Sequence, residues 1–371
     1  MPGFVIIAIL LVTVYGFAWL QKRVYSRYWN RNLSYSLSLS RKAVFEGEKI
    51  TITDSLTNGK RLPLPWVHVS YRISRFLVYL DNINKRIDRG ERRSLIYLIG
   101  MNKTVSRKST VLCSKRGCYR ATGFSISCNN LLMTHFETKN LDLMFELLVY
   151  PRIVDYPESV IPLKKLLGDV MVRRFIDPDP FTFKGIREYQ PYDSFRQINW
   201  GATARTGEMM TNIYDFTLSQ DITVLLNLQD YNRFDRDFVH EEAIRLAAFL
   251  CRRCVSMGLP VSLVCPGPDG KPVRIGSGLS ETHLRSVYTA LAYINLLKTS
   301  ASVVDWFPIE PGKSTVLISS YHKGDILEQF ISARERDAGA LWIIPFCGRD
   351  GITAPTGGSI MTWEVYEDAE V

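Results

Sequence analysis

The sequence lacks the short motifs that identify the commonest nucleotide-binding and hydrolytic sites. Its 371 residues contain no Gly-x-x-x-x-Gly-Lys loop and no Gly-x-Gly-x-x-Gly segment that opens a helix. A Gly-x-Ser-x-Gly nucleophile elbow is also absent. The five histidines each stand apart along the chain: His68, His135, His240, His283 and His322. We therefore expect no bound cofactor and no enzyme activity, although an enzyme with an unfamiliar site stays open as an alternative.

Cysteine is too sparse and too scattered to form a disulfide framework. The seven cysteines are an odd number without regular spacing, which favours a reducing compartment. Cys251 and Cys254 have the spacing of a redox motif, but they fall within an amphipathic helical pattern. No second cysteine pair or histidine cluster accompanies them, so we predict packed cysteines and no metal.

Acidic residues are absent from the start of the chain. Residues 1–40 hold four Lys or Arg and no acid, and residues 41–120 hold 18 Lys or Arg against six Asp or Glu. The whole chain has a net charge of +9, so the basic excess belongs to its N-terminal half. Such a surface suits either DNA or anionic lipid. Because a membrane segment precedes it, we expect no nucleic acid, and two readings stay open: contact with anionic lipid, or a basic surface that is simply solvated.

Residues 4–20 form an uncharged apolar run that is just long enough to span a bilayer. A secretory signal peptide is the alternative, but no Lys or Arg precedes the run. Basic residues follow it at once: Lys22, Arg23, Arg27 and Arg31. The positive-inside rule then predicts a single-pass protein of the cell membrane whose soluble part lies in the cytoplasm.

Two further domains are predicted from hydrophobic periodicity. Residues 33–150 contain short alternating stretches separated by turn signals, which predicts an Ig-like β-sandwich. Residues 151–215 form a connector that contains several Pro, Asp and Arg. Residues 216–371 alternate buried strands with amphipathic helices, which predicts an α/β domain with a doubly wound parallel sheet. The fold class is therefore α+β multidomain behind an N-terminal transmembrane helix.

The connector concentrates arginine and aromatic residues in one stretch. Its chemically distinctive members are Gly185, Arg187, Tyr189, Asp193, Arg196, Trp200 and Arg205. Guanidinium groups beside aromatic rings and one carboxylate predict a fixed, hydrogen-bonded and stacked polar cluster. Three roles stay open: an ion-pair network tying the connector to the α/β domain, a docking surface for a protein partner, and an anion site.

The stretch also resembles the hallmark of a bacterial family known as domain of unknown function 58. That hallmark is Gly-x-Arg-x-Tyr-x-x-Gly-Asp-x-x-Arg-x-Ile-x-Trp followed by Ala-Arg, and Tyr192 stands here in place of its second glycine. Upstream, Arg116-Gly-Cys-Tyr119 and Val149-Tyr-Pro151 are similar to two shorter family patterns. The Asp-Pro-Phe-Gly-Leu-Phe stretch usual in the family is absent, and one membrane helix stands where the family often has two.

The resemblance implies a membrane-tethered β-sandwich followed by a von Willebrand factor A-like domain. Such a domain holds a divalent cation with Asp-x-Ser-x-Ser at the end of its first strand, whereas this chain has Asn227, Gln229 and Tyr231 there. These side chains lack the negative charge that Mg²⁺ requires, so we expect a degenerate site. The resemblance also implies a MoxR-type AAA+ ATPase as partner, and it implies no catalytic activity.

Two functional hypotheses follow. The first is a membrane-anchored, non-enzymatic adaptor or assembly factor that binds a protein partner such as a MoxR-type ATPase. The second is a divalent-metal-dependent ligand-binding domain of the von Willebrand factor A type.

Overall fold

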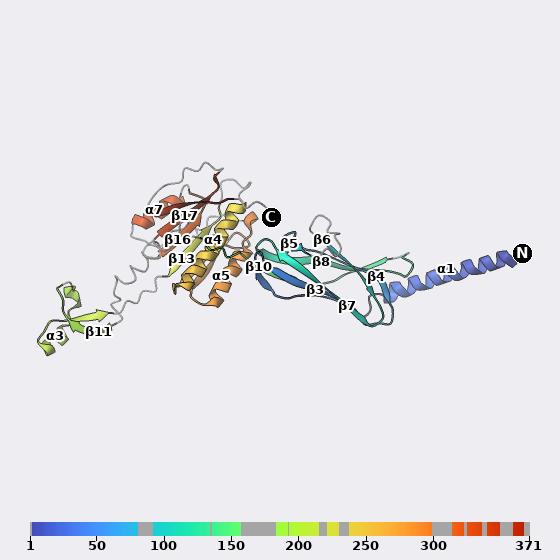
Figure 1. The fold of residues 1–371 in the computed structure, drawn as a ribbon, viewed down its shortest axis with the longest axis horizontal. Coiled ribbons are helices and arrows are strands. Elements are labelled where there is room, and N and C mark those ends of the chain that lie inside the picture. The colour runs from blue at the N-terminus through green and yellow to red at the C-terminus, as the bar shows by residue number, and fades with distance from the viewer. Residues whose placement is uncertain are drawn as a thin grey trace. The chain divides into compact units, whose positions relative to one another are not determined.

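A computed structural model describes the chain at residues 2–80, 92–133, 136–156, 183–191, 193–214, 221–229, 237–298, 314–322, 325–335, 340–348 and 359–366. The chain divides into two compact units, Met1–Arg152 and Ile153–Val371, and we describe each by itself. The first unit contains helix α1 and strands β1–β10, and the second contains strands β11–β18 with their helices (Figure 1).

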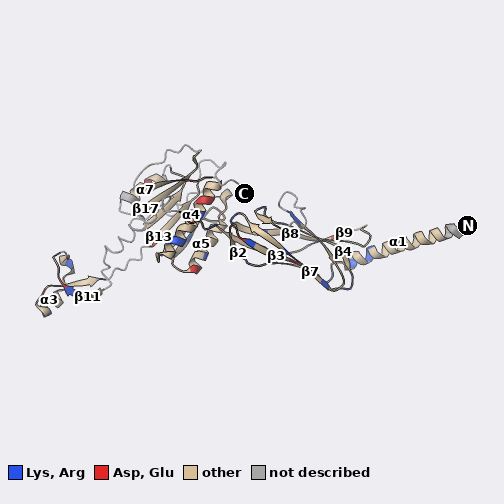
Figure 2. Cartoon of the chain, viewed as in Figure 1, with Lys and Arg blue, Asp and Glu red and all other residues tan. Residues whose placement is uncertain are grey.

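Helix α1 (Pro2–Tyr28) contains the apolar run of the sequence. The stretch Ile6–Tyr28 is long and apolar enough to cross a membrane, with a mean hydropathy of 1.4 and few buried side chains. The helix continues beyond the predicted span of residues 4–20, into the basic stretch that follows it. Figure 2 shows the Lys and Arg residues at this C-terminal end of α1.

The C-terminal end of α1 is packed into the first unit. Gln21 and Tyr25 lie one turn apart on the same face of the helix, and both are buried. Trp29, one turn further and just past the end of the helix, is also buried. The Tyr25 hydroxyl donates a hydrogen bond to the Pro63 carbonyl oxygen at 2.8 Å. The helix is therefore joined to the β domain by side-chain packing as well as by the chain itself.

Two sheets make up the rest of the first unit. One has the order β1-β3-β7-β5, with bounds Leu33–Leu39, Lys49–Asn58, Lys103–Cys113 and Leu77–Tyr79. The other has the order β2-β10-β8-β4-β6, with bounds Ala43–Phe45, Phe145–Tyr150, Gly117–Asn129, Leu64–Arg72 and Arg92–Ile99, and β9 (Phe136–Asn140) pairs with β8. Buried and exposed side chains alternate along most of the longer strands, and both sheets contribute to one hydrophobic core. The predicted β-sandwich is therefore present.

A buried carboxylate lies inside this core. Asp54 on β3 is fully buried and accepts hydrogen bonds from the hydroxyls of Tyr35 and Tyr71. The Arg93 guanidinium lies 3.8 Å from its second oxygen. Burial raises the pKa of Asp54, and the donors around it act in the opposite direction. The network accounts for an ionisable side chain in an apolar core without requiring a functional role.

The second unit is built on a six-stranded sheet of order β15-β14-β13-β16-β17-β18. The bounds in that order are Pro272–Gly278, Val261–Pro266, Ile222–Asn227, Ser314–Ser319, Ala340–Phe346 and Ile360–Glu364. Five strands are parallel, but β15 pairs antiparallel with β14, so the prediction of a parallel sheet is wrong at this edge. The reason is the short connection between β14 and β15, which is closed by a hydrogen bond from Gly267 N to Lys271 O. So short a hairpin can join two strands only in antiparallel orientation.

The helices of this unit follow the predicted pattern. Helix α4 (Asp237–Ser256) buries an apolar stripe that is typical of an amphipathic helix: Val239, Ala243, Leu246, Ala247, Leu250 and Cys254. Helix α5 (Glu281–Tyr293) is capped by Ser280, whose hydroxyl accepts from His283 N, and α7 (Asp325–Glu335) follows β16. The chain moves from β13 to β14 in one direction and from β16 to β17 in the other. Right-handed crossovers therefore put α4 and α7 on opposite faces of the sheet.

Candidate functional site

The Gly185–Arg205 stretch is folded around a small antiparallel sheet of its own. Strand β11 (Phe183–Glu188) pairs with β12 (Met210–Tyr214), and the chain between them contains η1 (Phe195–Gln197) and helix α3 (Trp200–Thr206). Gly185 lies at an irregularity in this pairing, and a side chain there would meet open space. The sequence predicted a connector here and missed both strands and the helix. We call residues 183–214 the hairpin segment.

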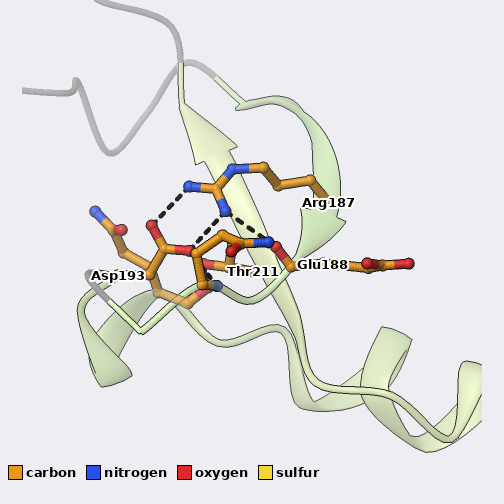
Figure 3. Close-up of polar contacts among 6 residues, drawn as sticks. Arg187, Glu188, Asp193 and Thr211 are labelled. Atoms are coloured by element: carbon orange, nitrogen blue, oxygen red, sulfur yellow. Dashed lines mark hydrogen bonds and ion pairs between the residues drawn. The ribbon is translucent and has the colours of Figure 1, made fainter.

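One ion pair fixes the loop that follows β11. The Arg187 guanidinium donates to both carboxylate oxygens of Asp193, at 2.7 and 2.6 Å, in the fork geometry shown in Figure 3. The same guanidinium also donates to the backbone carbonyl of Glu188, at 3.0 Å. The backbone N–H of Gln190 donates to Asp193 at 2.9 Å. Only 8% of the Asp193 side chain is exposed, so the pair closes the loop from inside.

This arrangement also controls the protonation of Asp193. The two hydrogen bonds from Arg187, helped by the backbone N–H of Gln190, hold the pKa of the Asp193 carboxyl below its ordinary value. The carboxylate is therefore charged at neutral pH, and the pair with Arg187 persists under physiological conditions.

Asn199 connects the helix of the hairpin segment to its sheet. Its side-chain oxygen accepts from Ala202 N at 2.9 Å, which caps the N-terminus of α3. Its side-chain amide donates to the Asn212 side chain on β12 at 2.7 Å. The Thr203 hydroxyl adds a bond to the Asn199 carbonyl and accepts from Met210 N. Asn199 was not singled out from the sequence, because the weak helix-forming residues that follow it hide the start signal that an asparagine gives at an N-cap.

The largest side chains of the hairpin segment face outward. Phe195 is 71% exposed and Trp200 is 69% exposed. Arg196 and Arg205 are exposed as well, and within the described parts of the chain neither has a hydrogen-bond or ion-pair partner. Tyr189 is half-buried, with its ring 5.7 Å from that of Phe195.

The predicted cluster is therefore only partly assembled. The structure brings together Arg187 and Asp193, and it places Tyr189 beside Phe195 instead of an arginine. Arg196, Trp200 and Arg205 lie on the outside of the segment. Tyr192, the departure from the family hallmark, lies outside the described residues.

A second polar group lies where the order of the large sheet reverses, between β13 and β16. In such sheets, ligands bind beyond the carboxyl ends of the strands at this point. Asn227 ends β13 and donates from its amide to the Ser319 hydroxyl at the end of β16, at 3.1 Å. Ser319 in turn donates to the Tyr321 carbonyl at 2.9 Å, and Gln229 N donates to the Asn227 side-chain oxygen.

These residues do not fit a divalent cation. Asn227 and Ser319 are buried and bonded to each other, which leaves neutral oxygens already engaged in hydrogen bonds. Among the residues that the structure describes, no three His, Cys, Asp or Glu side chains gather closely enough to hold a metal. The third predicted position, Tyr231, lies outside the described residues.

The Cys251 and Cys254 thiols are packed in the interior of α4. Both are buried and free. Burial raises the pKa of Cys254 to about 12 and also raises that of Cys251 well above its ordinary value. A thiol with so high a pKa is a poor nucleophile at neutral pH, so the redox spacing of this pair reflects helix packing.

A comparison with known families agrees with the residue pattern of the hairpin segment. The family model described as "Protein of unknown function DUF58" matches residues 185–314. This match supports the DUF58 family. It begins at Gly185, covers about a third of the chain, and includes the Arg187–Asp193 pair, α3 and β13 through β15. No curated protein matches the chain.

Solved structures are similar only at a distance. A CARDB domain of Pyrococcus furiosus, described as a complex with di-metal ions, is 12% identical, with a TM-score of 0.21 over 32% of this chain and 91% of that one. A cohesin module from a Clostridium perfringens family 33 glycoside hydrolase is 8% identical, with a TM-score of 0.22 over 32% and 96%. The sporulation control protein Spo0M of Bacillus subtilis is 10% identical, with a TM-score of 0.19 over 43% and 58%. Likenesses at these scores carry no argument about function.

Proposed function

We propose that this chain is a membrane-anchored, non-enzymatic adaptor of the cytoplasmic face whose hairpin segment binds a protein partner such as a MoxR-type AAA+ ATPase. The observation that carries the proposal is the outward display of Phe195, Arg196, Trp200 and Arg205 on a segment whose backbone is fixed by internal hydrogen bonds.

The composition of this display is that of a binding surface. Trp, Tyr and Arg are the residues most enriched among those that dominate protein–protein binding energies. The Arg187–Asp193 pair and the Asn199 cap fix the backbone from within, so the exposed side chains need little ordering when a partner arrives. Because Arg196 and Arg205 have no partner among the described residues, they also favour an acidic surface on the other protein.

The membrane anchor and the α/β domain complete the proposal. Helix α1 is the proposed anchor, on the strength of its length and apolarity and of the cations that follow it. The second unit is proposed to be von Willebrand factor A-like with a degenerate metal site. The central position of β13, the antiparallel edge strand β15 and the neutral Asn227–Ser319 pair support this.

A binding measurement with purified proteins tests the adaptor. The full chain in detergent is immobilised and exposed to the MoxR-type ATPase of the same organism. We expect saturable binding, weakened at least about tenfold by Trp200→Ala or Arg196→Ala, the loss typical of a central interface residue. The matched control is Arg253→Ala, an exposed arginine on α4. Absence of binding, or equal binding by all variants, would refute the proposal.

The alternative function, a metal-dependent ligand-binding domain, is decided by calorimetry. The neutral side chains of Asn227 and Ser319 predict no heat of binding when the full chain is titrated with Mg²⁺, Mn²⁺ or Ca²⁺ at millimolar concentration. A saturable heat that Ser319→Ala abolishes would favour the alternative over the adaptor.

A further inference from the structure

Helix α1 and the β-sandwich share a junction that fixes the height of the sandwich along the helix. Gln21, the first residue after the apolar run of residues 4–20, is buried. Tyr25, one turn further along the same face, belongs to the hydrophobic core of the sandwich, so we take the sandwich to cover this face up to the end of the apolar run. The Ser26 hydroxyl donates to the Glu137 carboxylate of β9 at 2.8 Å, which places β9 beside the helix.

An apolar strip is exposed at this same end of the sandwich. Strand register places Trp66, Asn129 and Phe136 in one row across β4, β8 and β9, on the face opposite the core. Leu98 on β6 points to the same outer face. Leu98 is 72% exposed and Phe136 is 67% exposed. Figure 2 labels β4 and β9 at the end of the sandwich from which α1 leaves.

The connection after β8 extends the strip toward the apolar run. Leu131, Leu132 and Met133 are consecutive and exposed. Cys128 on β8 pairs with Glu137 on β9, and Glu137 contacts Ser26 of α1, so these three residues lie at the same height along the helix. Leu131 is three residues after Cys128 and therefore lies at most about 10 Å from that height. The apolar run of α1 ends at Leu20, six residues from Ser26, or about 9 Å along the helix. The two apolar surfaces therefore end at similar heights.

We infer that this strip, composed of Trp66, Leu98, Leu131, Leu132, Met133 and Phe136, inserts into the interfacial layer of the bilayer that α1 spans. The inference rests on the proposed anchoring by α1. Aromatic and long apolar side chains are favoured at the headgroup level, and an exposed apolar surface of this kind marks an interaction site.

The charge around the strip identifies a lipid surface as the occupant. Lys22, Arg23 and Arg27 are exposed on the faces of α1 that the sandwich does not cover, and Arg61 lies in the loop that precedes β4. Cations beside an apolar strip are attracted to anionic headgroups while the apolar side chains enter the acyl boundary. The sandwich is then a membrane-seated platform held at two places, instead of a domain swinging from a single helix.

Spin-label accessibility in lipid nanodiscs tests the inference on the full chain. Cys118 and Cys347, the two cysteines that are not buried, are replaced by serine to give a background for single labels. Labels are then attached at Met133→Cys and Leu98→Cys within the strip. The matched control is Lys49→Cys, which lies at the end of β3 remote from α1. A label at Leu10→Cys within α1 reports whether the helix is in the bilayer.

We expect the labels at positions 133 and 98 to collide more with lipid-soluble oxygen than with a water-soluble nickel chelate, giving a positive depth parameter like that at position 10. The label at position 49 should give a negative value. A negative value at 133 and 98 with a positive value at 10 overturns the inference and leaves the anchor intact. Protection of 133 and 98 from both reagents indicates a protein or second copy as occupant and also overturns it. A negative value at position 10 refutes the anchor itself.

Discussion

At the scale of single residues, Arg187 and Asp193 are the pair on which the hairpin segment depends. The Asp193 carboxylate receives three hydrogen bonds, two from Arg187 and one from Gln190 N. Because these bonds lower the pKa of Asp193 in the folded protein, their stabilisation is present above the ordinary pKa of aspartate, 3.8, and is lost as the pH falls through the lower folded value.

We therefore predict that Asp193→Asn removes the fork with Arg187 and loosens the loop at every pH. In the parent chain, hydrogen exchange of residues 186–198, corrected for intrinsic rates, should stay protected from pH 7 down to near the ordinary aspartate value. It should lose protection only in more acidic solution, whereas the variant should lack this step. Glu188→Gln, an exposed neighbour, is the control. An unchanged acid step in Asp193→Asn would show that another group controls the loop.

The sequence predicted that Arg187 and Asp193 take part in a polar cluster, but it did not predict that Arg196 and Arg205 lie outside that cluster. Asp193 can pair with only some of the nearby arginines, and their spacing in the sequence does not show which arginine it pairs with. Arg187 forms the pair because the turn that follows β11 brings Asp193 back beside the Arg187 guanidinium. Arg196 and Arg205 are directed outward by η1 and α3, two elements that the sequence analysis did not predict.

At the scale of elements, helix α3 depends on its cap. It has seven residues, including a glycine and two β-branched threonines, so its intrinsic helix propensity is low. We predict that Asn199→Ala destabilises α3 by about 1 kcal/mol, because the Ala202 N–H loses its acceptor. The measurement is the amide-exchange protection of residues 202–207.

A matched variant separates the two roles of Asn199. Asn199→Ser keeps an acceptor for the Ala202 N–H but removes the donor to Asn212. It should preserve protection in α3 and lower it in β12. Equal loss in α3 for both variants would mean that the bond to Asn212, and not the cap, maintains the helix.

The elements that the sequence predicted correctly share a strong periodic signal. The stripe of α4 repeats every three or four residues over about four turns, and Ser280 precedes α5 with a clear capping pattern. Strand β15 was missed because it contains Pro272, Gly276 and Gly278, which are poor strand residues. Its position at the sheet edge tolerates them. The β11–β12 pair was missed because its strands are short and 21 residues separate them along the chain.

At the scale of the whole molecule, the distribution of charge supports the proposed orientation of the α1 anchor. No Lys or Arg precedes the apolar run, and four follow it before residue 40. We predict that a reporter fused after Val371 is active if it is of a kind that functions in the cytoplasm, and inactive if it is of a kind that functions only outside it. Replacing Lys22, Arg23, Arg27 and Arg31 together with neutral residues should reduce this preference. Activity of a reporter that functions only outside the cytoplasm would reverse the proposed orientation and would contradict the proposed contact with a cytoplasmic ATPase.

The central claim is that the hairpin segment is a docking surface for an AAA+ ATPase. Its most direct test is photocrosslinking in living cells with a photoreactive amino acid in place of Trp200, compared with the same substitution at Arg253 on α4. We expect an ultraviolet-dependent adduct with a MoxR-type ATPase at position 200 and none at position 253. Failure to form that adduct at position 200, or equal adducts at both positions, would contradict it.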